Sequence, residues 1–209
     1  MTDVQPGYDA MAAEYARVLP DPFQTPLERG AVDAFAAHVR AADLGPTIVD
    51  VGCGTGHIAA HLTTAGFSVT AVDPSAGMLD QARLAYRDLS FTRDDASLGS
   101  VDLGAAAGVI ARYSLIHVAP EQVRETLRDW AARLRSGSVV LLAGQSTDES
   151  GTAPFDHAVA PAWRWHPDEV VRALSDAGFA ELWRTVSRPS DGYGRFSRVP
   201  RVRATLIDD

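Results

Sequence analysis

A short glycine-rich turn between two apolar segments constrains the fold of this chain more than any other feature. The apolar run from Thr47 to Val49 leads into DVGCGTGH at residues 50–57, and a second apolar run ends at an acid in VTAVDPS, residues 69–75. A strand, a glycine turn, a helix and a second strand that ends in a carboxylate form half of a nucleotide-binding fold. Asp73, at the tip of the second strand, can accept hydrogen bonds from both hydroxyls of a ribose. The sequence therefore predicts an adenosine-containing ligand.

The spacing of the glycines indicates which kind of ligand this is. A dinucleotide-binding turn reads G-x-G-x-x-G and holds a pyrophosphate at a helix N-terminus, whereas Gly52, Gly54 and Gly56 form the shorter G-x-G-x-G. Asp50 precedes the turn and would repel a pyrophosphate, but its charge suits a sulfonium or an α-amino group. On these residues, DVGCGTGH resembles the first motif of the class I S-adenosylmethionine-dependent methyltransferases, and VDPS resembles their second motif.

The resemblance implies a site for S-adenosylmethionine, with S-adenosylhomocysteine as the product. Family members often place an apolar side chain against the adenine near Met78, although Met78 fits equally well as a core residue. Asp95 matches the acid–alanine pair of the family better than Asp94 does, because Ala96 follows it. The residues expected to bind the cofactor are Tyr8, Tyr15, Asp50, Gly52, Cys53, Gly54, Asp73, Pro74, Met78, Asp95, Ala96 and Arg112.

Strand-like and helix-like segments alternate along the chain, which indicates an α/β fold with a parallel sheet. Strands are expected at 47–51, 68–72, 89–92, 102–111, 138–145, 179–187 and 196–207. Helices are expected at 8–18, 25–42, 56–65, 76–86, 120–134 and 167–178, with Thr25 and Ser75 as N-caps. The resemblance implies a Rossmann-like seven-stranded sheet in the order 3-2-1-4-5-7-6, with an antiparallel last strand and helices on both faces.

Residues 1–209 are expected to form a single methyltransferase domain, in which two segments could close the site. Tyr8 and Tyr15 lie seven residues apart in a segment that resembles the family's YDxxAxxY start, a lid over the cofactor. The same spacing also fits a helix packed on the core. Residues 1–42 would form this helical lid, and the insertion 147–165 would shape the pocket for the methyl acceptor.

The loop after the fourth strand is expected to lie beside the transferred methyl group, because ligands of open α/β sheets bind at the carboxyl ends of the strands. It runs from Arg112 to His117, and its YSLIH form resembles a group of bacterial small-molecule methyltransferases. His117 is the first candidate for a catalytic base, since imidazole titrates near neutrality; a histidine that bonds the backbone is the alternative. His157 in the insertion is the second candidate, with a surface histidine as its alternative.

The composition of the chain limits the kinds of molecule that it is expected to bind. A formal net charge of −8 argues against nucleic acid, whose phosphates require a basic face. The single cysteine, Cys53, excludes an internal disulfide and fills the glycine turn with a small side chain. With no apolar stretch long enough to cross a bilayer, we expect a cytoplasmic monomer or homodimer that does not bind membranes. His57 and His61 have no third ligand nearby, so no metal is expected.

These observations predict an enzyme that moves a methyl group from S-adenosylmethionine to an O, N or C atom of a small molecule. One alternative is a module that binds the cofactor without catalysis. Another is a nicotinamide-dependent oxidoreductase, which the glycine spacing and Asp50 disfavour.

Overall fold

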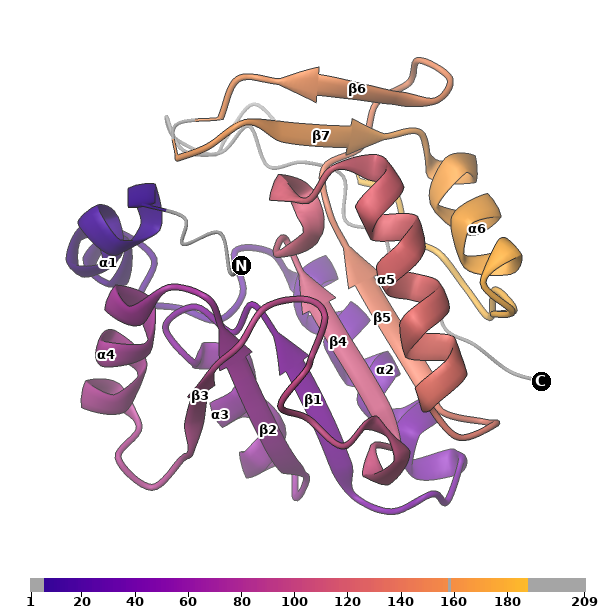
Figure 1. Ribbon diagram of the computed structural model, residues 1–209. Helices are drawn as coiled ribbons and strands as arrows, with labels where there is room; N and C mark the ends of the chain where they lie inside the picture. Colours follow the sequence, from indigo (N-terminus) through magenta and orange to yellow (C-terminus); the bar gives the residue numbers. More distant parts are fainter. Residues whose placement is uncertain (1–5, 158, 188–209) are drawn as a thin grey trace.

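Five parallel strands form the centre of the molecule (Figure 1). The structure, a computed structural model, describes residues 6–157 and 159–187. The strands lie in the order β3-β2-β1-β4-β5, which confirms the order expected for the first five. Their bounds are β1 Thr47–Val51, β2 Ser68–Asp73, β3 Phe91–Arg93, β4 Gly108–Arg112 and β5 Val139–Ala143. The strand order reverses between β1 and β4, so the carboxyl ends of these two strands mark the expected ligand crevice.

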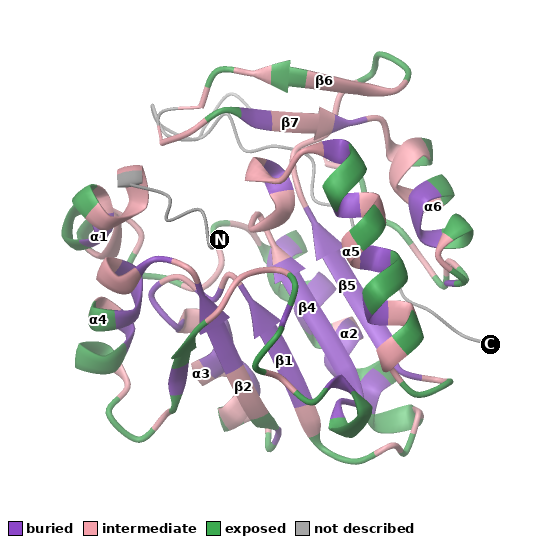
Figure 2. Ribbon diagram, viewed as in Figure 1, coloured by how far each residue is buried: buried purple, intermediate pink, exposed green. Residues whose placement is uncertain are grey.

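Helices cover both faces of this sheet, which explains why its strands are nearly continuous apolar runs. On one face α2 (Pro26–Ala41) and α3 (His57–Thr64) pack against Ile48, Ile110 and Leu141. On the other face α5 (Pro120–Arg133) and α6 (Pro167–Asp176) pack against Val49 and Val109. Successive residues of each strand thus face opposite layers. Figure 2 shows the strands as the buried centre of the molecule, with exposed residues on the outer faces of the helices.

Local sequence signals fix several helix starts. Thr25 caps α2, because its Oγ1 accepts a hydrogen bond from Glu28 N at 3.2 Å, and Pro26 occupies the first helical position. Ser75 likewise caps α4 (Ala76–Ala85) through a bond from Met78 N at 3.2 Å. Both caps confirm the sequence prediction. In the part of the chain that the structure describes, no helix has the length and apolar character needed to span a bilayer.

Two predicted strand boundaries are wrong. The segment 102–111 begins with a 3₁₀ turn, η1 (Leu103–Ala105), and β4 starts only at Gly108. Asp102 causes this difference, because its carboxylate accepts a bond from Gly104 N at 3.0 Å and caps the turn. The third strand runs over 91–93 instead of 89–92, because Leu89 N bonds Tyr86 O in a turn at the end of α4.

The last part of the chain differs more from the prediction. Residues 179–187, all of them described, contain no strand, and Arg184 in this segment instead pairs with Asp168 of α6 at 2.6 Å. The predicted partner strand 196–207 lies outside the described residues. The insertion 147–165 contains an antiparallel hairpin that the sequence did not reveal, formed by β6 (Thr152–Phe155) and β7 (Ala162–Trp165). Figure 1 shows this hairpin above the carboxyl edge of the sheet.

Backbone pairing joins the hairpin to the end of β5. Trp165 N donates to Gln145 O at 3.1 Å, and Thr147 N donates to Trp165 O at 3.2 Å. The insertion is therefore anchored to the edge of the sheet where the ligand crevice is expected. Helix α1 (Pro6–Val18) lies on the other side of that edge, beside α4 (Figure 1).

Candidate cofactor cleft and active site

The glycine turn is packed tightly on one side and open on the other. Gly52 N and Cys53 N both donate to Val72 O, at 2.8 and 2.9 Å, which folds the turn over the end of β2. Gly52 has a φ of +69°, and a Cβ there would overlap the side chain of Ser114 in the loop after β4. A Cβ on Gly54, by contrast, would meet nothing within 4 Å. Only glycine fits at 52, and the space beside 54 is free for a ligand.

Asp73 is held rigidly at the tip of β2. Its Oδ2 accepts from Gly54 N at 2.9 Å and its Oδ1 accepts from Ser75 N at 2.8 Å. Burial raises the pKa of Asp73, while these two backbone donors partly offset the effect. Each carboxylate oxygen can accept a further hydrogen bond. The side chain therefore lies at the tip of β2 with accepting capacity to spare, and its role as an acceptor for ribose hydroxyls stays a prediction.

Asp50 is a buried acid with an unused oxygen. It is 2% exposed, and its Oδ2 has no hydrogen-bond partner within the described residues. Burial raises the pKa of Asp50 to about 7, although the positive charge of Arg112 acts in the opposite direction. A buried carboxylate oxygen without a partner costs free energy unless a donor or a cation reaches it. The arrangement therefore suits a ligand that brings positive charge to the end of β1.

Arg112 is already engaged by the protein. Its Nη2 lies 3.2 Å from Glu28 Oε2 in a buried ion pair, since the arginine side chain is 11% exposed and the glutamate side chain 3%. Its Nη1 also donates to Pro22 O at 3.3 Å, and Glu28 accepts from Gln24 N at 2.9 Å. The guanidinium thus ties α2 to the end of β4 and adds positive potential near Asp50. The sequence analysis missed Glu28, although its position three residues after Thr25 is that of a capping-box acid.

Helix α1 is fastened to the start of α4. Asp9 Oδ1 accepts from Ser75 Oγ at 2.6 Å and from Gly77 N at 2.9 Å. Gly77 permits this close approach, since a Cβ there would lie 2.9 Å from Asp9 O. These bonds lower the pKa of Asp9. They hold α1 next to Asp73, as a lid would require. The YDxxAxxY pattern contains Asp9, although Asp9 was not among the expected cofactor residues.

Three more predicted cofactor residues lie around the glycine turn. Met78 is 2% exposed in the first turn of α4, so most of its surface already contacts protein. Cys53 is buried too, and burial raises the pKa of its thiol well above the ordinary value, which leaves it un-ionised and unsuited to nucleophilic chemistry. Pro74, between Asp73 and Ser75, accepts a bond from Arg93 Nε at 3.1 Å through its carbonyl.

Asp95 and Ala96 lie in the loop after β3. Asp95 Oδ1 accepts from Ser97 N at 2.9 Å and from Ser97 Oγ at 2.6 Å. Ala96 O accepts from Trp130 Nε1 at 2.9 Å, which ties the loop to α5. These contacts stiffen the loop at the same sheet edge as Asp73, and they use only part of the accepting capacity of Asp95.

The candidate bases lie together on the far side of the cleft. His117 ends a 3₁₀ turn, η2 (Leu115–His117), and its Nε2 lies 3.1 Å from the Tyr8 hydroxyl of α1. Its Nδ1 lies 3.0 Å from Pro161 O in the insertion. The rings of His117 and His157 meet edge to face at 4.9 Å between centroids, and Tyr15 meets Tyr8 in the same way at 6.3 Å. The lid, the loop after β4 and the insertion therefore converge on one cluster of side chains.

Burial sets the protonation of both histidines. It lowers the pKa of His117, partly offset by the carbonyls of Pro161 and Ala160. It also lowers the pKa of His157, with the nearby His117 acting in the same direction and Asp156 opposing it. Both imidazoles are thus neutral at pH 7, the state in which an imidazole can accept a proton.

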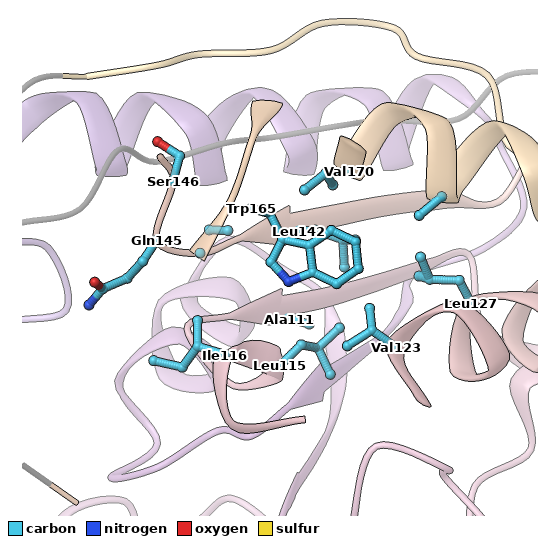
Figure 3. Close-up of a pocket in the computed structure, with 13 residues that line it drawn as sticks. Ala111, Leu115, Ile116, Val123, Leu127, Leu142, Gln145, Ser146, Trp165 and Val170 are labelled. Carbon is cyan, nitrogen blue, oxygen red and sulfur yellow. The ribbon is translucent and has the colours of Figure 1, made fainter. Parts of the chain in front are cut away.

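A cavity of about 50 Å³ is lined in part by Leu115 and Ile116 of the turn η2 (Figure 3). Its walls are apolar side chains from η2, α5, β5, β7 and α6, among them Ile116, Leu127 and Trp165. Gln145 and Ser146 lie at one end and Leu127 at the other. Ser146 Oγ is buried there without a hydrogen-bond partner among the described residues. The cavity is therefore suited to a small apolar group.

Comparison with known proteins agrees with this geometry. Residues 48–137 match the family described as "Methyltransferase domain". An O-methyltransferase of Pyrenophora dematioidea is 30% identical over 155 residues, which cover 66% of this chain and 55% of the relative. The chain thus spans about half the length of that relative. In these matches the chain is similar to methyltransferases, and the family model covers residues 48–137.

Solved structures show the same fold at low identity. The magnesium protoporphyrin IX methyltransferase of Synechocystis PCC 6803, with bound SAH, has a TM-score of 0.69 and 18% identity, over 100% of this chain and 99% of that one. The 1,6-didemethyltoxoflavin-N1-methyltransferase of Burkholderia thailandensis has a TM-score of 0.70 and 19% identity, over 98% and 87%. The fold is therefore Rossmann-like, as the resemblance implied.

Proposed function

We propose that the protein transfers a methyl group from S-adenosylmethionine to an O, N or C atom of a small molecule. The observation that carries this proposal is the unpaired, buried oxygen of Asp50, next to a glycine turn that is open at Gly54 and to the fixed carboxylate of Asp73. This set complements a ligand with a cationic end and a ribose. A pyridine dinucleotide would bring a pyrophosphate to the same acid, so the oxidoreductase alternative fits poorly.

Each part of the cofactor has residues to hold it. In this proposal Asp50 takes the positive methionine end, Asp73 takes the ribose, and Asp95 and Ala96 face the adenine. Arg112 supports the cleft through its ion pair with Glu28. The remaining residues line the turn, the adenine side and the lid: Gly52, Cys53, Gly54, Pro74, Met78, Tyr8 and Tyr15.

The bound cofactor would supply an activated methyl group, so the chain must align the acceptor, exclude water and remove a proton where the acceptor has one. His117 is the proposed base and His157 the second candidate, since both are neutral and lie where the lid meets the insertion. The cavity bounded by Trp165 supports an acceptor with a short apolar group. An acidic chain with one buried thiol fits a small-molecule enzyme of the cytoplasm, active as a monomer or homodimer.

Calorimetry tests the binding half of the proposal. The protein should bind S-adenosylhomocysteine and release no comparable heat with NADH. Asp50→Asn should weaken the binding by tenfold or more, because it removes one charge from a buried pair. Absence of heat with S-adenosylhomocysteine would end the methyltransferase proposal.

Turnover tests the catalytic half. Labelled S-adenosylmethionine is incubated with a panel of phenols, amines and carboxylic acids, and transfer is compared between wild type, His117→Asn and His38→Asn. His38 lies exposed on α2 and serves as the matched control. His117→Asn should lose about 10²-fold or more in rate. Binding of the cofactor without transfer to any acceptor of the panel would favour a non-catalytic binding module.

A further inference from the structure

Both ring nitrogens of His117 are already occupied, which limits how it can act as a base. Nδ1 lies 3.0 Å from Pro161 O, and a carbonyl oxygen can only accept. Nδ1 therefore carries the hydrogen and donates it. In a neutral imidazole the other nitrogen is then the bare acceptor. The backbone of the insertion thus fixes the tautomer in which Nε2 is the basic atom.

Tyr8 covers that basic atom. Its hydroxyl lies 3.1 Å from Nε2 and must be the donor in this pair, since Nε2 has no hydrogen. Burial is the main reason that the pKa of Tyr8 is raised, and the charge of Asp73 and the neighbouring Tyr15 add to the effect, so the phenol keeps its proton at neutral pH. Because the Tyr8 hydroxyl already occupies Nε2, an acceptor can pass its proton to this nitrogen only by way of Tyr8 or after Tyr8 has moved.

We propose that Tyr8 is a catalytic residue, which receives the proton of the acceptor on its Oη and passes its own proton to Nε2 of His117. The inference rests on the proposed methyltransferase function and deepens it. Tyr8 Oη can accept one hydrogen bond while it donates another, as a relay requires. Pro161 is the positioning residue, because its carbonyl keeps Nδ1 protonated throughout the transfer.

The step is balanced. The bond between the acceptor atom and the methyl group forms while the bond between the methyl group and sulfur breaks, so the sulfonium becomes a neutral thioether. In the same step the acceptor loses its proton to Tyr8 Oη. The original Tyr8 proton moves to Nε2, so the tyrosine ends as it began and His117 ends as an imidazolium. The imidazolium then returns its proton to solvent after the products leave. No other co-reactant is needed.

The first arm of the test is NMR of ¹⁵N-histidine-labelled protein saturated with S-adenosylhomocysteine, which requires no known acceptor. His117 should appear as the neutral tautomer with hydrogen on Nδ1. Tyr8→Phe should raise the pKa of His117 by about half to one pH unit, since a bond to the bare nitrogen favours the neutral ring. Among the residues that the structure describes, the other titratable ring in contact with His117 is that of His157, which the substitution leaves in place.

The control is a second tyrosine–histidine pair. Tyr86 lies 2.7 Å from Nδ1 of His57, away from Tyr8 and His117. Tyr86→Phe should move the resonances of His57 and leave the pKa of His117 unchanged. Hydrogen on Nε2 of His117 in the wild type, or an unchanged pKa in Tyr8→Phe, would overturn the relay even if S-adenosylhomocysteine binds as the proposed function requires.

The second arm is kinetic, with the best acceptor of the panel that carries an ionisable proton. Tyr8→Phe should lower kcat about 10²-fold while the KM values and the affinity for S-adenosylhomocysteine change less than about threefold. The acid limb of the pH–kcat profile should move upward together with the pKa of His117. A Tyr8→Phe variant that keeps kcat, when His117→Asn loses it, would show direct transfer to His117. Weakened cofactor binding with unchanged kcat would show that Tyr8 acts only as a lid contact.

Discussion

Gly52 offers a sharp test of the site, because it meets two separate physical limits. Its φ of +69° lies in the left-handed region, where a residue with a Cβ loses roughly 1–2 kcal/mol. A Cβ there would also overlap Ser114 Cβ and lie 3.3 Å from Ser114 Cα. Overpacking of this kind costs about 1–3 kcal/mol. Gly52→Ala should therefore destabilise the fold by about 3 kcal/mol, which lowers the Tm of a chain of this size by about 6–12 °C.

Gly54→Ala is the matched control, because it shares the backbone strain without the overlap. Its φ is +53°, and a Cβ there would meet nothing within 4 Å. The expected cost is about 1–2 kcal/mol, hence a smaller loss of Tm. The added methyl group would project into the space reserved for the ligand, so affinity for S-adenosylhomocysteine should fall by more than tenfold. Thermal unfolding and calorimetry on both variants measure the two effects.

A double variant separates strain from overlap. Ser114→Gly removes the atom that a Cβ at position 52 would strike, so it should recover about 1–3 kcal/mol in the Gly52→Ala background. Equal losses of Tm in Gly52→Ala and Gly54→Ala, or no recovery in the double variant, would refute the argument that this loop approaches too closely for a side chain.

Three further outcomes are expected. Asp9→Ala removes two hydrogen bonds that fasten α1, so the backbone amide hydrogens of residues 6–18 should exchange with solvent faster by about tenfold or more. Glu14→Ala is the control, because it loses only an exposed ion pair with Arg17 and should leave hydrogen exchange unchanged. Burial raises the pKa of Asp50 from 3.8 to about 7, so the folded state binds the proton more tightly and wild-type stability should fall as the pH rises from about 4 to 7. Asp50→Asn should make the free energy of unfolding nearly independent of pH over this range, and at pH 8 the variant should be more stable than wild type by up to about 4 kcal/mol in urea titrations. A variant whose stability falls with pH as steeply as that of wild type would contradict the raised pKa of Asp50. Glu28→Gln leaves the Arg112 charge buried and should cost about 3 kcal/mol in the same titrations, while a loss below about 0.5 kcal/mol would show that water reaches the pair.

The parts of the fold that follow from local chemistry were predictable. Alternating strands and helices indicate a parallel sheet, and the resemblance to the methyltransferase family supplied the order β3-β2-β1-β4-β5. Thr25 and Ser75 mark helix starts because their oxygens bond free backbone NH groups. The placement of Asp73 follows as well, because a residue at the end of β2 must lie beside the turn after β1 in a parallel sheet.

The parts that depend on contacts between distant segments were not predictable. The hairpin β6–β7 forms in a segment where the sequence shows only scattered aromatic residues. Its hydrogen bond to Gln145, just after β5, joins residues that lie 20 positions apart in the sequence. Segment 179–187 contains aromatic and β-branched residues, which favour strands. A strand also needs a partner, however, and Arg184 pairs with α6 instead. The tautomer of His117 depends on Pro161, 44 residues away in sequence. The residue pattern within a single segment does not indicate which distant residues it will contact.

The first helix connects these findings, because two neighbouring residues on it reach opposite ends of the site. Consecutive side chains on a helix point about 100° apart, so α1 can direct Asp9 toward Ser75 and Tyr8 toward His117 only if it lies between them. The bonds of Asp9 and Tyr8 therefore depend on the same docked position of α1. Loss of the Asp9 anchor should loosen the hydrogen bond from Tyr8 to His117, although the side chain of Asp9 bonds Ser75 and Gly77 instead of His117. In the relay that we propose, the helix that lies next to Asp73 also completes the path for the proton, so both functions depend on the same docked position of α1.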